Sequence, residues 1–189
     1  MEDIQVNRQY EDVSKILVSE QEIDEITTEI AKKISEDFAG EEHLVLLGLL
    51  KGSMPFMADL MRKLSIPAEI DFMKVSSYGA STVSSRKTNI ILDLNRKNID
   101  ECAILIVEDI IDSGNTLKNI VAHLKAKGAR SVHTCTMLDK PSRREVDMQA
   151  DYVGRIIPDE FVIGYGLDYD EKYRTLPFIG VLDPKVYTK

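Results

Sequence analysis

The sequence predicts an α/β fold in which helices flank a mainly parallel β-sheet. Short, wholly apolar runs alternate with longer segments whose apolar residues recur at helical spacing, which is typical of parallel strands joined by helices. Residues 44–50 read LVLLGLL and residues 104–107 read ILIV, so neither run has a polar face to turn towards water. The length of 189 residues predicts one domain.

Residues 19–38 predict an amphipathic helix. The stretch begins SEQE, in which Ser19 and Glu22 have the spacing of a capping box. Isoleucines follow at helical spacing, at Ile23, Ile26, Ile30 and Ile34, and Gly40 ends the pattern. This helix is expected to cover one face of the sheet.

The run at 44–50 predicts a central strand, followed by the turn Lys51-Gly52-Ser53 and a helix over 54–64. Ser53 is predicted to cap this helix, and Pro55 suits its first turn. The residues expected to face the core are Met54, Met57, Ala58, Met61 and Leu64. A Lys-Gly turn is common, so the residues alone favour no function for it.

Residues 68–76 and 89–95 predict the two strands of a hairpin. Between them, residues 77–89 are rich in Ser, Thr and Gly, which predicts a long mobile loop. Composition leaves two interpretations open: a disordered hairpin tip, or a lid that closes over a binding site.

The stretch that organises the chain, residues 104–117, reads ILIVEDIIDSGNTL. Its apolar start predicts a buried strand, and residues 117–128 then show apolar residues at helical spacing, ending at Gly128. A further strand at 131–138 completes a βαβ unit, in which the two strands are parallel and the crossover is right-handed.

Ligands of such sheets bind at the carboxyl ends of the strands. Three segments are expected to meet there: Lys51, the loop at 108–116, and the pair Asp139-Lys140. The convergence of three strand ends at one edge predicts a binding site.

The residue types in the 108–116 loop suit a sugar phosphate. Gly114 allows close backbone approach, and the N–H groups of the following helix favour an anion, with Ser113 and Thr116 as further donors. Three carboxylates lie beside them, at Glu108, Asp109 and Asp112. They would repel a phosphate unless they bind sugar hydroxyls and a hard cation such as Mg²⁺, and capping the helix needs only one of them. A ligand such as 5-phosphoribosyl 1-pyrophosphate, with a phosphate, a diol and a metal-bound pyrophosphate, meets these demands.

With these residues the chain resembles the phosphoribosyltransferases, and the bacterial hypoxanthine-guanine group almost end to end. The stretch PDEFVIGYGLDYDEKYR, residues 158–174, is nearly as specific as 104–117. The resemblance implies a type I phosphoribosyltransferase core, a small hood formed mainly by about 150–189 and the N-terminal segment, and a mobile lid at about 77–89. It also implies Mg²⁺-dependent purine salvage, in which the phosphoribosyl group moves to N9 of hypoxanthine or guanine and gives IMP or GMP plus pyrophosphate.

The resemblance assigns roles to individual residues. Asp112 is the implied proton acceptor, facing N7 of the purine. The ribose and 5′-phosphate are assigned to Glu108, Asp109, Ile110, Ile111, Asp112, Ser113, Gly114, Asn115 and Thr116. The pyrophosphate is assigned to Leu50, Lys51, Gly52 and Arg174, the purine to Lys140, Phe161, Val162 and Asp168, and the lid to Ser77 and Tyr78. The implied Mg²⁺ contacts are Glu108, Asp109 and Asp168.

The bulk composition limits the partners. A net charge of −8 argues against a general nucleic-acid binder, and no apolar run is long enough to cross a membrane. The N-terminus lacks the pattern of a signal peptide, so we expect a cytoplasmic protein. Cys102 and Cys135 are expected to be free, buried thiols. The resemblance implies a dimer or tetramer, and the sequence does not decide between them.

Two other function classes stay open. One is a regulator on the same fold, such as the RNA-binding pyrimidine attenuation proteins, although the acidic balance and the lack of a basic patch argue against it. The other is a different reaction at the same site, with adenine or xanthine as substrate or with hydrolysis of a nucleotide sugar. A 6-oxopurine calls for a donor such as Lys140, whereas adenine calls for an acceptor.

Overall fold

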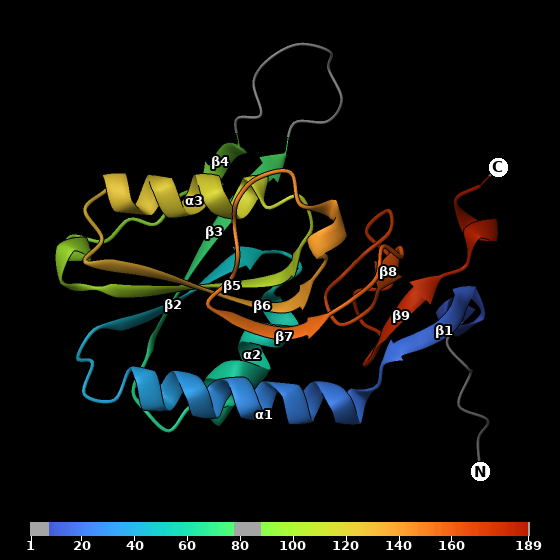
Figure 1. Ribbon diagram of the computed structural model, residues 1–189, viewed down its shortest axis with the longest axis horizontal. Coiled ribbons are helices and arrows are strands. Elements are labelled where there is room, and N and C mark those ends of the chain that lie inside the picture. The colour runs from blue at the N-terminus through green and yellow to red at the C-terminus, as the bar shows by residue number, and fades with distance from the viewer. Residues whose placement is uncertain (1–7, 78–87, 189) are drawn as a thin grey trace.

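The computed structural model describes residues 8–77 and 88–188, which form two sheets and the helices around them (Figure 1). The larger sheet has six strands in the order β4-β3-β2-β5-β6-β7, and the smaller has the order β1-β9-β8. The strands are β1 (Val13–Val18), β2 (Leu44–Leu50), β3 (Glu69–Ser77), β4 (Thr88–Leu92), β5 (Ala103–Ile111), β6 (Ser131–Asp139), β7 (Tyr152–Ile156), β8 (Val162–Ile163) and β9 (Ile179–Leu182). The helices are α1 (Glu20–Asp37), α2 (Met54–Lys63) and α3 (Asn115–Ala126), with 3₁₀ turns η1 (Arg8–Asp12), η2 (Ile99–Glu101), η3 (Pro141–Arg143) and η4 (Pro184–Val186).

The large sheet is mostly parallel, as the sequence predicts. β3, β2, β5, β6 and β7 run in the same direction, and β4 returns antiparallel to β3. In register, Leu105 of β5 lies opposite Leu46 of β2 on one side and His133 of β6 on the other. The carboxyl ends of β2, β5 and β6 therefore meet at one edge.

Helices cover both faces of this sheet (Figure 1). Because successive strand residues point to opposite faces, Leu44 and Leu46 pack in the core beneath α1 and α2, whereas Val45 and Leu47 pack in the core beneath α3. The wholly apolar composition of β2 follows from this burial on both sides.

The start of α1 has the predicted capping box. The Glu22 N–H donates to Ser19 Oγ at 3.2 Å, and the Ser19 N–H donates to Glu22 Oε2 at 2.9 Å. Two N–H groups that a helix start leaves without partners are thereby satisfied.

The predicted cap of α2 is wrong. Ser53 is already helical, with φ −67° and ψ −13°, so its hydroxyl turns back and donates to the Leu49 carbonyl at 2.7 Å. Met54 and Met61 are also not core residues, since they are 55% and 40% exposed. The ten-residue helix buries one face only, through Phe56, Met57 and Leu60.

The second sheet combines both ends of the described chain. β1 pairs antiparallel with β9, which in turn pairs with β8. A separate small core supports it, formed by Ile163, Tyr173, Leu176, Phe178 and Leu182. This sheet lies beyond the carboxyl ends of the large-sheet strands (Figure 1).

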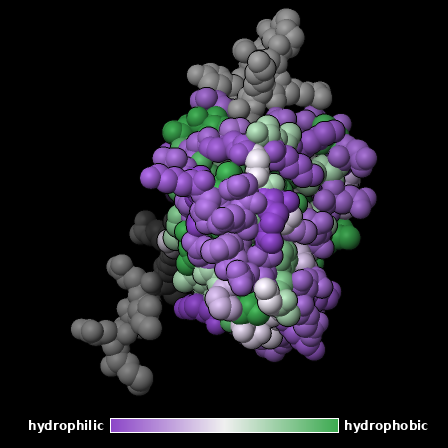
Figure 2. All heavy atoms as spheres, turned by 90° about the vertical axis from the view of Figure 1, so that its left-hand side faces the viewer, coloured by the Kyte–Doolittle hydropathy of each residue, from purple (hydrophilic) through white to green (hydrophobic). Residues whose placement is uncertain are grey.

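The far edge of the molecule, turned away from the second sheet, is mainly hydrophilic (Figure 2). Both cysteines are buried and unpaired. Within the described residues, no helix combines the length and the apolar character needed to cross a membrane.

Candidate active site

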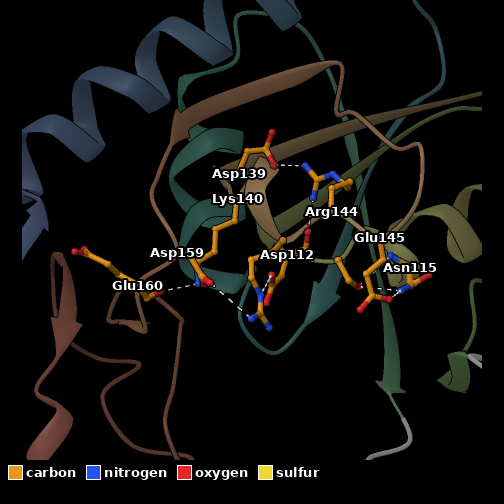
Figure 3. Close-up of polar contacts among 10 residues, drawn as sticks. Asp112, Asn115, Asp139, Lys140, Arg144, Glu145, Asp159 and Glu160 are labelled. Carbon is orange, nitrogen blue, oxygen red and sulfur yellow. Dashed lines mark hydrogen bonds and ion pairs between the residues drawn. The ribbon is translucent and has the colours of Figure 1, made fainter.

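The candidate site lies where β5 and β6 end. The Lys140 N–H, just after β6, donates to the carbonyl of Ile111 at the end of β5 at 2.9 Å. This bond holds the two following loops side by side. The close-up in Figure 3 shows Asp112 from the first loop beside Lys140 from the second.

The loop after β5 is shorter than predicted. We expected it to begin at Glu108, but β5 continues to Ile111, which pairs with Asp139 of β6. Glu108 and Asp109 therefore lie on the strand. Hydrogen bonding with β6 continues past the two carboxylates, so they do not end the strand as expected.

A small pocket of about 100 Å³ opens at the start of α3. Its lining is Glu108, Ile110, Ile111, Asp112, Ser113, Gly114, Thr116 and Leu117. Gly114 has φ +82°, and a Cβ atom there would lie 2.9 Å from Arg144 Cδ, so the turn requires glycine. The pocket combines a helix start with two hydroxyls, which suits a phosphate group.

Asn115 links this turn to a neighbouring loop through hydrogen bonds. Its N–H lies 3.3 Å from Ser113 Oγ, and its side-chain amide donates to the same oxygen at 3.2 Å and to Glu145 Oε2 at 2.8 Å. The turn is thus tied to the loop between β6 and β7 (Figure 3).

A larger pocket of about 320 Å³ lies beside the small one. Its lining is Ile110, Asp112, Lys140, Arg143, Asp159, Glu160, Phe161, Val162 and Leu167. Lys140 is only 7% exposed, and its ammonium donates to the Glu160 carbonyl at 2.6 Å. Leu167, rather than its neighbour Asp168, completes the wall.

Phe161 presents an exposed ring to this pocket. The ring is stacked on Tyr187, with centroids 5.4 Å apart and an interplanar angle of 28°. Tyr169 meets the same ring edge-on at 5.6 Å. The aromatic cluster holds Phe161 in place while leaving 41% of the residue exposed.

Two arginines that the sequence analysis did not single out contact Asp112. Arg143 Nε donates to Asp112 Oδ1 at 3.1 Å, and Arg144 Nη1 donates to the Asp112 carbonyl at 2.5 Å. Arg144 also pairs with Asp139. The sequence signal was the basic pair in KPSRR, directly after a predicted strand end.

The strand carboxylates carry perturbed pKa values. Burial, reinforced by the nearby Asp109 charge, raises the pKa of Glu108 well above its usual value. Burial also raises the pKa of Asp109 to about 6, although the Ile110 N–H and the Arg174 charge act in the opposite direction. Two carboxyl groups that resist ionisation in the free protein favour a cationic ligand beside them.

The turn after β2 lies against Asp109 and against the loop between β8 and β9. A Cβ atom on Gly52 would lie 1.5 Å from Asp109 Oδ2, and one on Gly166 would lie 1.9 Å from the Gly52 carbonyl oxygen. Both glycines are therefore required by close approach. The peptide bond between Leu50 and Lys51 is cis.

Arg174 organises the loop beside this turn. Its Nη1 donates to the Gly166 carbonyl at 2.7 Å, and its Nη2 lies 2.8 Å from Asp168 Oδ1. Lys51 Nζ pairs with Glu171 at 2.9 Å. The structure thus brings the predicted pyrophosphate residues and Asp168 to one place next to Asp109.

The arrangement of the carboxylates indicates how Mg²⁺ could bind. Among residues 8–77 and 88–188, no three or more His, Cys, Asp or Glu side chains form a group that could hold an ion. These described residues therefore offer an ion one or two carboxylates at a time and not a complete cage. This fits Mg²⁺, which usually keeps waters and binds through one or two carboxylates plus substrate phosphates.

The lid prediction falls mainly on residues that the structure does not describe. Ser77 is the last residue of β3, and Tyr78 lies outside the described residues. Its role stays a prediction.

The fold and the site define a phosphoribosyltransferase. The chain belongs to this family, since the model described as "Phosphoribosyl transferase domain" matches residues 13–170. The hypoxanthine-guanine phosphoribosyltransferase of Bacillus subtilis is 49% identical over 176 residues, which are 93% of this chain and 97% of that protein. A crystal structure of a hypoxanthine phosphoribosyltransferase from Staphylococcus aureus superposes with a TM-score of 0.92 at 44% identity, covering 98% of this chain and all of that one.

The chain also resembles part of a longer protein. It is 47% identical over 180 residues to the bifunctional protein TilS/HprT of Listeria monocytogenes, covering 95% of this chain. The match spans only 28% of the Listeria protein.

Proposed function

We propose that this protein transfers the phosphoribosyl group of 5-phosphoribosyl 1-pyrophosphate to N9 of hypoxanthine or guanine. The products are pyrophosphate and either IMP or GMP, so the reaction salvages free purines. The names of the Bacillus and Staphylococcus relatives support this choice.

One observation carries the proposal: Asp112 and Ile110 line both pockets. A phosphate in the small pocket and a purine in the large one would leave the sugar between them. Asp112 is the carboxylate that lines both pockets, so it would lie beside the sugar and the base. It can reach both the sugar side and the base.

Base recognition rests on Lys140 and Phe161. The buried Lys140 ammonium would donate to the 6-oxo group, and it already donates to the Glu160 carbonyl at 2.6 Å. Phe161 would stack on the base, with the Val162 backbone at its edge. The adenine amino group cannot accept a hydrogen bond from an ammonium, so the pocket favours 6-oxopurines.

The reaction needs no covalent intermediate on the protein. The N9 lone pair forms the bond to C1′ while the C1′–O bond to pyrophosphate breaks, and its electron pair leaves with pyrophosphate. The ring proton at N7 passes to Asp112. Glu108 and Asp109, placed by β5, hold the ribose hydroxyls and offset positive charge that develops on the sugar.

The donor would be held at both ends. The small pocket suits the 5′-phosphate, and the backbone of Leu50, Lys51 and Gly52 suits the pyrophosphate together with Arg174. Glu108, Asp109 and Asp168 are the residues that would bind Mg²⁺, directly or through water; when bound, the metal neutralises the charge of the departing pyrophosphate. Ser77 and Tyr78 would close over the reacting centre and exclude water.

The wider organisation also stays a proposal. We infer one phosphoribosyltransferase domain over 1–189, with a hood from the second sheet, acting in the cytoplasm on small molecules. A homo-oligomer, dimer or tetramer, fits the family, and neither nucleic acid nor membrane is an expected partner.

The proposal is tested by a pyrophosphate-release assay with Mg²⁺ and the donor, run in parallel with hypoxanthine, guanine, xanthine and adenine. We expect release with hypoxanthine, guanine or both. Release with adenine or xanthine alone would contradict the base assignment, and no release with any base would contradict the reaction and turn attention to RNA binding.

A further inference from the structure

Arg143 bridges two loops at the mouth of the large pocket. It is the last residue of η3, three positions after Lys140, and its side chain lines the pocket. Its Nε donates to Asp112 Oδ1 at 3.1 Å, and its Nη1 lies 3.7 Å from Asp159 Oδ2. The guanidinium thus connects the loop after β5 with the loop after β7 through Asp112 and Asp159.

These contacts contribute little to the stability of the fold. The side chains of Arg143, Asp112 and Asp159 are 54%, 46% and 53% exposed, so water and salt screen their attraction. A structural role therefore does not explain the placement of Arg143 against Asp112.

The neighbouring Arg144 provides a direct contrast. Its side chain is only 14% exposed; it pairs with Asp139 and donates to the Asp112 carbonyl. Arg144 therefore fixes the backbone of Asp112, whereas Arg143 touches only its carboxylate. The two adjacent arginines act on different parts of one residue.

We propose that Arg143 is a positioning residue for proton transfer, which holds Asp112 Oδ1 so that Oδ2 faces the purine ring nitrogen. The inference rests on the proposed function, in which Asp112 accepts the ring proton. In that step the ring N–H bond breaks, its electron pair stays on the purine, and a new O–H bond forms at Oδ2. Arg143 keeps its own protons and fixes the plane of the carboxylate through a charge-assisted hydrogen bond.

The choice of arginine supports this role. A planar guanidinium presents its N–H groups in fixed directions, so it orients a carboxylate better than the rotating ammonium of lysine. Without that contact the Asp112 side chain would sample other rotamers and spend less time in the geometry that accepts a proton.

The test compares Arg143→Ala and Arg143→Lys with the wild-type protein in single-turnover pyrophosphate release, which isolates the chemical step. We expect Arg143→Ala to lower this rate by about tenfold to a hundredfold, as a small misplacement of a catalytic group does. Arg143→Lys should recover part of the loss. The dissociation constant of the donor should change little, because Arg143 lines the large pocket and not the small one, and that of the base should change less than the single-turnover rate.

A double-mutant cycle with Asp112→Asn separates positioning from general damage. If Arg143 acts through the Asp112 carboxylate, Arg143→Ala should cause no further loss in the Asp112→Asn background. The matched control is Arg130→Ala, which removes a half-exposed arginine paired with Glu41 before the amino end of β6. Its rate and thermal midpoint should equal those of the wild-type protein.

Several outcomes would overturn the inference. An unchanged single-turnover rate in Arg143→Ala would show that Arg143 does not act through Asp112. The same conclusion would follow if Arg143→Ala lowered the rate by the same factor in the Asp112→Asn background as in the wild-type protein. A lowered thermal midpoint with no rescue by lysine would indicate a structural role. Wild-type protein that forms no nucleotide from any 6-oxopurine would overturn the proposed function itself, which is a distinct result.

Discussion

Replacing Asp109 with Asn should stabilise the free protein at neutral pH while weakening donor binding. The Asp109 carboxyl lies against Gly52, and burial raises its pKa from the usual 3.8 to about 6. Above pH 6 the folded protein must therefore carry a shielded negative charge that the unfolded chain would expose to water. Asn is neutral, and its oxygen can still accept the Ile110 N–H, which donates to Asp109 Oδ1 at 2.7 Å.

The magnitude follows from the pKa. The rise from 3.8 to about 6 corresponds to at most about 3 kcal/mol, at about 1.4 kcal/mol per pH unit. The pKa of about 6 already includes the attraction of Arg174 for the carboxylate, so Asp109→Asn should gain up to this amount above pH 6. Because the folded state holds this proton more tightly than the unfolded state does, wild-type stability should fall as pH rises from about 4 to about 6 and then level off.

The assay is urea unfolding of the two proteins between pH 4 and pH 8 without Mg²⁺ or donor. The stability difference should be small at about pH 4, grow up to about pH 6 and stay constant above it. Asp170→Asn is the matched control, because that side chain is 78% exposed and pairs only weakly with Lys172. An Asp109→Asn protein that is less stable than wild type at pH 7, or a difference that does not grow with pH, would refute the reasoning.

Four further substitutions test the site. Asp112→Asn should lower turnover by about 10²- to 10⁴-fold with little change in donor binding, measured by steady-state kinetics. Lys140→Ala should raise the KM for hypoxanthine by about tenfold or more, because it removes a charged hydrogen-bond donor. An equal loss of affinity for 5-phosphoribosyl 1-pyrophosphate would point to general damage. Gly114→Ala should weaken donor binding in a titration, since its φ of +82° strains any side chain there. Tyr187→Ala removes the ring stacked on Phe161 and should raise the KM for the base by about threefold to tenfold, and an unchanged KM would refute that support.

Elements with a strong hydrophobic pattern could be predicted from the sequence. β2 (Leu44–Leu50) has the predicted bounds, because burial on both faces of the sheet required an unbroken apolar run. The capping box of α1 was also recognisable, since it depends on residues three positions apart. Local patterns determine local structure well.

Features that depend on distant partners were missed or misplaced. Ser53 is a residue type that caps helices, but its backbone is already helical and its hydroxyl donates to the Leu49 carbonyl instead. The extension of β5 to Ile111 depends on pairing with β6, and the carboxylates at positions 108 and 109 do not predict it. Pattern alone also could not show that α2 turns Met61 outwards.

The site shows the same division. The loop around Asp112 and the base-side Lys140 could be proposed from motifs, and the parallel topology explains why they meet. The contact of Arg143 with Asp112 and the stacking of Tyr187 on Phe161 join residues that lie 31 and 26 positions apart, with no spacing rule to reveal them. Such contacts are determined by tertiary packing.

The most direct test of the central claim is a crystal structure of the protein with IMP or GMP bound. We predict that the 5′-phosphate lies in the pocket at Gly114 and the purine in the pocket of Lys140 and Phe161, with N7 facing the Asp112 carboxylate. A purine bound elsewhere, or one whose N7 faces away from Asp112, would contradict the account.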